Sequence, residues 1–270
     1  MYAVVWKLMP EKDAVTEATR IVEEANRRNI TLRLFGGIAF RLKSPSTLHT
    51  HFKRHYVDID FVGLRNQRKQ ITNLFTDLGY TPRTTFNAMN GHIRLIFNDL
   101  ENKRRVDIFL NVFEMSHKFD FTDRLNIDEL TLPLADLLLT KLQVFEITER
   151  EYKDVIAFLY DHNLGEIDNK NTINMKYIAK LCSNDWGLWR TISLNLERIR
   201  DSLPKYAPDH REVVMHKIDH LKRRIDEEPK SFGWKMRAKV GDKVKWYELP
   251  EADREVIDSR PVTERQTETK

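Results

Sequence analysis

Cysteine is almost absent from the sequence, and Cys182 is the single one among 270 residues. One thiol cannot form an intrachain disulfide, so the chain is not a disulfide-stapled domain, and its composition fits a reducing compartment. Long apolar runs are also missing, because Pro133 and Asp136 interrupt the longest one well short of the roughly 18 residues of a membrane span. The first residues, MYAVVWKLMPEKD, lack the positive start and cleavage site of a secretory signal. We therefore expect a cytoplasmic protein with no membrane partner.

A strong excess of one charge is missing as well. The net charge is only +4 with a pI near 9.0, so the composition does not mark a nucleic-acid binder. Basic residues nevertheless gather in short runs, namely HFKRH, RNQRK, NKRR, HLKRRI and KMRAKVGDKVK. Each run either meets phosphate or is a solvated surface, and charge alone does not separate the two.

The first part of the chain mixes helical and strand patterns, and 41% hydrophobic residues are enough to build a core. Apolar residues at helical spacing predict a helix over 11–29, followed by a buried strand over 30–35 that Gly36-Gly37 breaks. The pattern then predicts a short helix after the glycines, a strand over 56–64, a helix over 66–80 that ends at Gly79, and a hairpin of strands 92–99 and 104–113.

From about residue 133 onward the pattern is helical. We predict helices over 133–148, 150–162, 172–183, 186–203 and 209–227, and a terminal hairpin over 235–249 that turns at Gly241-Asp242. The charged tail from about residue 253 lacks large apolar residues, and we expect it to be disordered. The predicted organisation is therefore an α/β part over 1–130, a mainly helical domain over 131–252 and a tail over 253–270.

Two carboxylates on the strand over 56–64 are the first candidate site. Side chains alternate along a strand, so Asp58 and Asp60 lie on one face while Val57, Ile59 and Phe61 face the core. Paired carboxylates suit hard divalent cations such as Mg²⁺. The Asp-x-Asp pattern is common, however, and by itself it is equally consistent with an exposed acidic strand face.

Two further features favour a site. Gly36-Gly37 stands between a strand and a helix, where glycine lets the backbone approach a phosphate and the helix start offers free N–H groups. Asp107 in RRVDIFL lies on a later strand with Val106 and Ile108 on the opposite face, and would add a third carboxylate to one metal cluster.

The order strand, Gly-Gly, helix, then Asp-x-Asp on a strand, then a lone Asp on a later strand, resembles the polymerase-β-like nucleotidyltransferase superfamily. GGIAF is similar to the minimal bacterial branch that contains the AbiEii-type toxins of toxin–antitoxin systems. The segment LPLADLLLTKLQVFEITEREYKDVIAFL resembles the helical part of that branch, with Lys141 followed by an R-x-x-K-D signature at 150–154. The resemblance covers roughly residues 30–162. It implies an α/β (α+β) nucleotidyltransferase fold with a mixed sheet, followed by a mainly helical C-terminal domain.

The resemblance also implies a reaction and a metal. A nucleoside monophosphate would move from an NTP to an acceptor hydroxyl with two Mg²⁺ ions, or Mn²⁺ in their place. Asp58, Asp60 and Asp107 would be the catalytic residues and metal ligands, with Asp107 on the acceptor side. Which NTP is used is left open.

The remaining implied roles concern the nucleotide. Gly36 and Gly37 would hold the outer phosphates through backbone amides, and Lys141 would neutralise the triphosphate. Arg150, Lys153 and Asp154 either contact and orient the nucleotide or form a salt-bridge set on the helix surface.

The acceptor is the least determined part. The second motif position is glycine instead of the common serine, and a long segment with His49, His51, Arg54 and His55 precedes Asp58. That segment either binds acceptor or triphosphate or is a solvated insertion. Basic pairs at 53–54, 104–105 and 222–224 favour RNA, tRNA included, over a protein or small-molecule acceptor, and a toxin would have an antitoxin protein as partner. The alternatives are an aminoglycoside-type small-molecule nucleotidyltransferase and a non-catalytic nucleotide-binding module.

Three other features favour structural roles. His216 and His220 are four residues apart on a predicted helix, but no glutamate follows the first histidine as in zinc proteases. Trp186 and Trp189 recur at helical spacing and are typical of a core. Cys182 has no charged neighbour that would activate it, so we expect a buried thiol.

Overall fold

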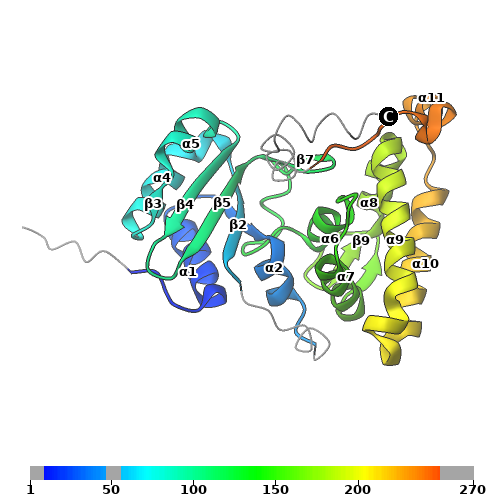
Figure 1. Ribbon diagram of the computed structural model, residues 1–270, viewed down its shortest axis with the longest axis horizontal. Helices are drawn as coiled ribbons and strands as arrows, with labels where there is room; N and C mark the ends of the chain where they lie inside the picture. The colour runs from blue at the N-terminus through cyan, green and yellow to red at the C-terminus, as the bar shows by residue number, and fades with distance from the viewer. Residues whose placement is uncertain (1–8, 47–55, 250–270) are drawn as a thin grey trace, which may run out of the picture.

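A mixed five-stranded sheet organises the first half of the computed structural model, which describes residues 9–46 and 56–249 (Figure 1). Its strands are β1 (Leu32–Phe35), β2 (Asp58–Gly63), β3 (Thr81–Pro82), β4 (Arg94–Asp99) and β5 (Arg104–Leu110), in the order β1-β2-β5-β4-β3. β2 pairs with β5 in parallel, and the other neighbours are antiparallel. The predicted mixed sheet and the β4–β5 hairpin are confirmed.

Two helices, α1 (Ala14–Arg27) and α4 (Arg68–Asp77), accompany this sheet, and α4 covers one of its faces. The ring of Phe75 from α4 lies 6.0 Å from that of Phe61 and 4.9 Å from that of Phe97. Because side chains alternate along a strand, the aspartates of β2 and β5 belong to the opposite face. The predicted inward position of Val57 is wrong: this residue precedes the strand and is 49% exposed.

Helix α2 (Gly36–Lys43) connects the sheet to the helices of the second half, and Figure 1 shows it between them. The helix includes both glycines, whereas we expected it to start after them. Phe40 of α2 packs on Phe158 with 4.7 Å between ring centroids. Close by, the predicted boundary near residue 130 is bonded to β1, because Leu34 donates to Leu130 and accepts from Leu132, each at 2.9 Å. Buried apolar residues of both halves belong to one continuous cluster.

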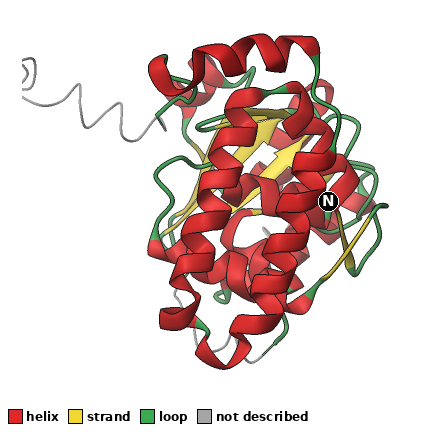
Figure 2. Ribbon diagram, turned by 90° about the vertical axis from the view of Figure 1, so that its right-hand side faces the viewer, coloured by secondary structure: helices red, strands yellow, loops and turns green. Residues whose placement is uncertain are grey.

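The second half is mainly helical, and its helices stand in front of the sheet in Figure 2. All five helices predicted here are present with shifted ends: α6 (Leu134–Leu142), α7 (Glu149–Asp161), α8 (Met175–Asn184), α9 (Trp186–Tyr206) and α10 (Arg211–Glu227). Short elements were not predicted, namely α5 (Thr84–Asn90), the β6–β7 pair (Val112–Glu114 and Lys118–Asp120) and the β8–β9 pair (Asn163–Gly165 and Thr172–Asn174). None of the described helices is both long enough and apolar enough to cross a membrane.

The predicted terminal hairpin is wrong, because α11 (Phe232–Val240) and a 3-10 turn (Gly241–Lys243) occupy that stretch. Ser231 starts the helix by accepting from the Trp234 amide at 3.2 Å. The Arg237 guanidinium then donates to the carbonyls of Gly241 and Val244, each at 2.7 Å. These local bonds satisfy the turn that we assigned to a hairpin. The predicted disorder over 253–270 lies outside the described residues.

Cys182 and Trp186 have the buried positions that we expected of them. Cys182 is completely buried, and burial raises the pKa of its thiol far above the usual value. Trp186 is buried and lies 6.2 Å from Trp189, ring to ring, within a cluster that also includes Trp246. The rings of His216 and His220 lie 6.3 Å apart on α10.

Candidate active site

The parallel pairing of β2 with β5 brings the three predicted aspartates together. In this register Asp60 lies directly opposite Asp107, and Asp58 lies opposite Arg105. Residues opposite each other on neighbouring strands share a face, so Asp58, Asp60 and Asp107 form one acidic row on the face away from α4. Asp60 and Asp107 are 47 positions apart in the sequence, and only the strand register makes them neighbours.

Burial and the neighbouring carboxylates raise the pKa values of two aspartates in the row, Asp58 and Asp60. Burial raises the pKa of Asp60 to about 7, and repulsion from Asp107 and Asp58 adds to the effect. Reduced hydration and the charge of Asp107 also raise the pKa of Asp58. Two neighbouring carboxylates with raised pKa values indicate a place where a positively charged group would be stabilised.

Two arginines form ion pairs with the third carboxylate, that of Asp107. Arg94 of β4 lies 2.7 Å from Asp107, and Arg105 of β5 lies 2.8 Å from it. Asp107 is buried, whereas the side chain of Arg105 is 40% exposed. Sequence reasoning missed the role of Arg94. This residue lies on β4 two positions before Ile96, which is opposite Asp107, and so shares the face of the sheet with Asp107.

Gly36 allows close contact between α2 and the acidic row. A Cβ atom at this position would lie 2.2 Å from Oδ2 of Asp60, which no real contact allows. The residue also has a φ of +67°, a conformation that glycine adopts without a steric penalty. Gly36, the first glycine of the pair predicted to approach a phosphate, therefore lies directly against the central carboxylate, and the N-terminus of α2 begins beside it.

Lys141 and Asp154 form a pair on the helical side. Lys141 of α6 lies 3.1 Å from Asp154 of α7 and 3.4 Å from Glu151, and its positive charge lowers the pKa of Asp60. Asp154 is buried. Lys141 therefore faces the acidic row, and the ion pair with Asp154 holds its ammonium group in place.

The other two residues of the R-x-x-K-D signature point in different directions. Arg150 is exposed, and its charge opposes the rise in the pKa of Asp58. Lys153 pairs with Glu149 at 2.9 Å and lies 5.2 Å from the centre of the Tyr206 ring. The contacts thus divide the signature: Asp154 pairs with Lys141, and Lys153 belongs to a surface salt bridge.

The aspartates supply the chemistry that a divalent cation requires. Within residues 9–46 and 56–249, no three or more His, Cys, Asp or Glu side chains are arranged to hold a metal ion, and Asp107 is paired with two arginines. The donor set fits Mg²⁺ all the same, since all three ligands are carboxylates, and burial together with repulsion between them raises the pKa values of Asp58 and Asp60. Asp107 would join such a site if its ion pair with Arg105 broke and its carboxylate bound the cation instead.

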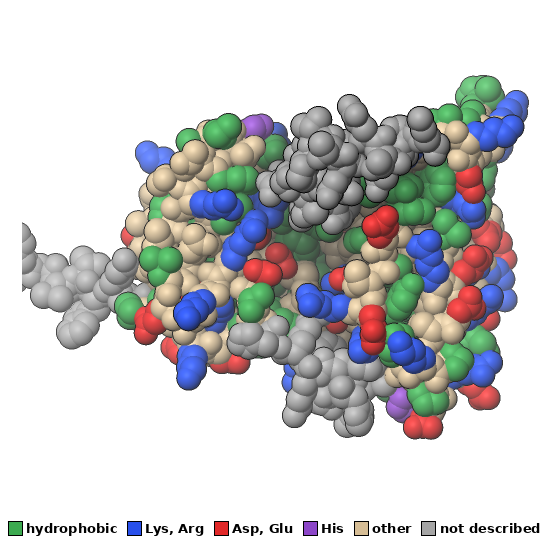
Figure 3. Space-filling model, in the orientation of Figure 1, with side chains coloured by type: hydrophobic (Ala, Val, Ile, Leu, Met, Phe, Trp, Pro, Cys, Tyr) green, Lys and Arg blue, Asp and Glu red, His purple; other side chains and the backbone are tan. Residues whose placement is uncertain are grey.

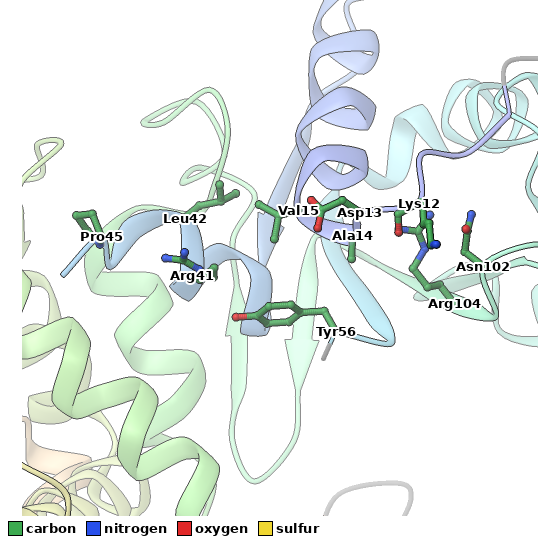
Figure 4. Close-up of a pocket in the computed structure, with 10 residues that line it drawn as sticks. All are labelled: Lys12, Asp13, Ala14, Val15, Arg41, Leu42, Pro45, Tyr56, Asn102 and Arg104. Carbon is green, nitrogen blue, oxygen red and sulfur yellow. The ribbon is translucent and has the colours of Figure 1, made fainter. Parts of the chain in front are cut away.

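Figure 3 shows acidic and basic side chains gathered around a hollow in the middle of the molecule. The larger defined pocket, of about 730 Å³, lies elsewhere and contains none of the three aspartates. Figure 4 shows residues of α2 on one side of it and residues at the start of α1 and the β4–β5 turn on the other, with Tyr56 between them. The candidate active site therefore lies on the face of the sheet outside this pocket.

Two of the basic runs that favoured RNA are partly engaged in ion pairs with acidic residues. Arg104 is buried and lies 2.6 Å from Asp99, so this half of the 104–105 pair does not reach solvent. On α10, Lys222 pairs with Glu197 at 2.7 Å, and Arg224 pairs with Glu228 at 2.7 Å. The basic segment with His49, His51, Arg54 and His55 lies outside the described residues.

Comparison with models of known protein families finds no match for this chain, and no curated protein matches its sequence. The resemblance to nucleotidyltransferases therefore rests on the motifs themselves.

Proposed function

We propose that this protein is a metal-dependent nucleotidyltransferase that moves a nucleoside monophosphate from an NTP to an acceptor hydroxyl. The observation that carries the proposal is the register of β2 and β5, which aligns Asp60 with Asp107 beside Asp58. The glycine turn, the acidic row and Lys141 come from separate segments of the chain and converge on one surface.

The nucleotide is held from two sides. The free N–H groups at the start of α2 face the outer phosphates, and Lys141 and Arg150 neutralise the triphosphate from the helical side. Asp58, Asp60 and Asp107 would hold Mg²⁺, which when bound supplies positive charge to the phosphates and the acceptor oxygen. Asp154 fixes the position of Lys141 through their 3.1 Å contact.

The reaction exchanges one phosphoester bond for another. The acceptor oxygen attacks the α-phosphorus in line with the leaving group, a new P–O bond forms, and the α–β bridging bond breaks to release pyrophosphate. The proton of the acceptor hydroxyl passes to Asp107. The protein acts mainly by positioning and charge stabilisation, because the bond-making step needs no covalent enzyme intermediate.

RNA is the preferred acceptor class. The exposed Arg83 at the β4 side of the site has no ion pair within the described part of the chain, and its positive charge favours a polyanion and opposes a cationic drug. A small-molecule nucleotidyltransferase of the aminoglycoside type would need an acidic acceptor cleft in the same place. An antitoxin protein as partner follows from the resemblance, and a cytoplasmic location from the single cysteine.

The first experiment measures the melting temperature of the protein with each NTP, with and without Mg²⁺. We expect a metal-dependent increase for the wild type that Asp58→Asn/Asp60→Asn abolishes. The matched control is Asp201→Asn, an exposed aspartate of α9 that should leave the increase unchanged. If no NTP raises the melting temperature of the wild type in Mg²⁺, the protein is not a nucleotidyltransferase.

A second experiment identifies the acceptor. The protein is incubated with α-³²P-labelled NTPs and total RNA, and the label is followed into RNA, protein and small molecules. We expect label on RNA that the double aspartate variant fails to transfer. Label that appears only on protein or on small molecules would contradict the RNA preference while leaving nucleotidyl transfer intact.

A further inference from the structure

A partly exposed aromatic ring lies next to the acidic row, on the part of the sheet away from α2. Phe86 of α5 has the guanidinium groups of both Arg83 and Arg94 at 5.9 Å from its ring centre. The same Arg94 lies 4.8 Å from the centre of the Phe109 ring and 2.7 Å from Asp107. Arg94 therefore joins an aromatic surface directly to the candidate active site.

A pocket of about 560 Å³ opens on this surface between β3, α5 and β4. Arg83, Phe86, Asn98 and Met89 are among its lining residues, and Met89 is 72% exposed. Arg83 is exposed and forms no ion pair with any residue in the described part of the chain. The pocket thus combines an apolar floor, amide groups and an unneutralised positive charge, which together suit a nucleobase with an adjoining phosphate.

The strand order assigns this surface to the acceptor. The sheet runs β1-β2-β5-β4-β3, so the glycine turn after β1 and the pocket at β4 and β3 lie on opposite sides of the acidic row. Lys141 and Arg150 also belong to the side of the phosphates. A triphosphate that contacts α2 leaves Asp107 and the β4 side for the group that receives the nucleotide.

We propose that Arg83, Phe86 and Arg94 bind the unpaired end of a single-stranded RNA acceptor, with its terminal base stacked on Phe86. This inference rests on the proposed function, because it assigns the acceptor side of the same site. Stacking requires an exposed base face, so the surface selects single strands over duplexes. Arg83 contacts a backbone phosphate, and Arg94 positions the terminal ribose near Asp107.

The test measures binding of a fluorescein-labelled single-stranded RNA by fluorescence anisotropy, without NTP. Phe86→Ala should weaken binding about 5- to 150-fold, the range expected for the loss of one base–aromatic stack, and Phe86→Tyr should retain it. Arg83→Ala should weaken binding of all sequences and reduce the dependence of affinity on salt. The matched controls are Phe232→Ala, which removes a ring that is 78% exposed on α11, and Arg27→Ala, and both should leave binding unchanged.

The outcomes separate this inference from the proposed function. The Mg²⁺-dependent melting shift with NTP should be the same in Phe86→Ala as in the wild type, which also shows that the variant is folded. If Phe86→Ala binds single-stranded RNA as tightly as the wild type, or if a blunt duplex binds equally well, the acceptor surface is wrong. If Phe86→Ala loses the NTP-dependent shift and keeps RNA binding, the ring serves the nucleotide and the inference is overturned.

Discussion

The contact between Gly36 and Asp60 leads to a prediction that can be worked out from geometry. In Gly36→Ala the new methyl group would lie 2.2 Å from Oδ2 and 3.2 Å from Cβ of Asp60. The carboxylate can rotate away, but the Cβ contact is tight enough that α2 or β2 must also shift. An L-residue at a φ of +67° costs about 1–2 kcal/mol, and overpacking adds about 1–3 kcal/mol. We expect Gly36→Ala to lower the free energy of unfolding by about 2–5 kcal/mol.

A double-mutant cycle separates the two contributions. In an Asp60→Ala background the carboxylate is gone and only the 3.2 Å contact with Cβ remains, so Gly36→Ala should cost less than in the wild type and approach the conformational part, about 1–2 kcal/mol. Gly241 gives an independent measure, because it has a φ of +59° and a Cβ there would meet nothing within 4 Å. Urea unfolding of the wild type and the variants gives the free energies. If Gly36→Ala costs the same with and without the Asp60 carboxylate, the close approach does not exist and α2 is not seated on the acidic row.

Three further predictions concern charge. The pKa of Asp60 rises from 3.8 to about 7 in the fold, so this residue destabilises the folded protein as pH rises through that window. The free energy of unfolding of Asp60→Asn should equal that of the wild type at pH 4 and exceed it at pH 8 by up to about 4 kcal/mol. Urea unfolding in EDTA measures both values. Lys217→Met should lower the free energy of unfolding by about 2–3 kcal/mol, because the Lys217 ammonium donates to three carbonyls at the end of α7 at 2.8–3.0 Å. Lys222→Met removes only an exposed ion pair and should lower it by less than about 1 kcal/mol. Equal losses in the two variants would contradict this prediction. Arg104→Met leaves Asp99 buried without its cation and should cost about 3–5 kcal/mol while RNA affinity per folded molecule stays constant, and a loss of affinity would restore Arg104 to the acceptor surface.

Local patterns were reliable for single elements. Alternation over 56–64 predicted β2 and placed Asp58 and Asp60 on one face, and helical spacing predicted α1, α7 and α10 within a few residues. The terminal hairpin failed because Gly241-Asp242 is an equally good turn signal after a helix, and the bonds from Arg237 to two carbonyls decide between the two. A turn signal reports where the chain changes direction and not which elements it joins.

Charged residues show the limit of sequence more clearly. Arg104 and Arg105 are adjacent in the chain, yet one is buried against Asp99 and the other lies half-exposed beside Asp107. The R-x-x-K-D signature likewise divides, with Asp154 against Lys141 and Lys153 against Glu149. The partner of a charge is set by packing between distant segments, and a run of basic letters carries no information about that partner.

The sequence alone determined the alternation that puts two aspartates on one strand face, the glycine pair before a helix and the helical character after residue 130. Those features depend on the chain over a few residues, where steric preference and periodicity act directly. Only the tertiary structure decided that Asp107 lies opposite Asp60, that Gly36 contacts that carboxylate and that Phe86 lies beside Arg94. Each of these contacts joins segments that are far apart in the chain, and strand register and helix packing bring them together.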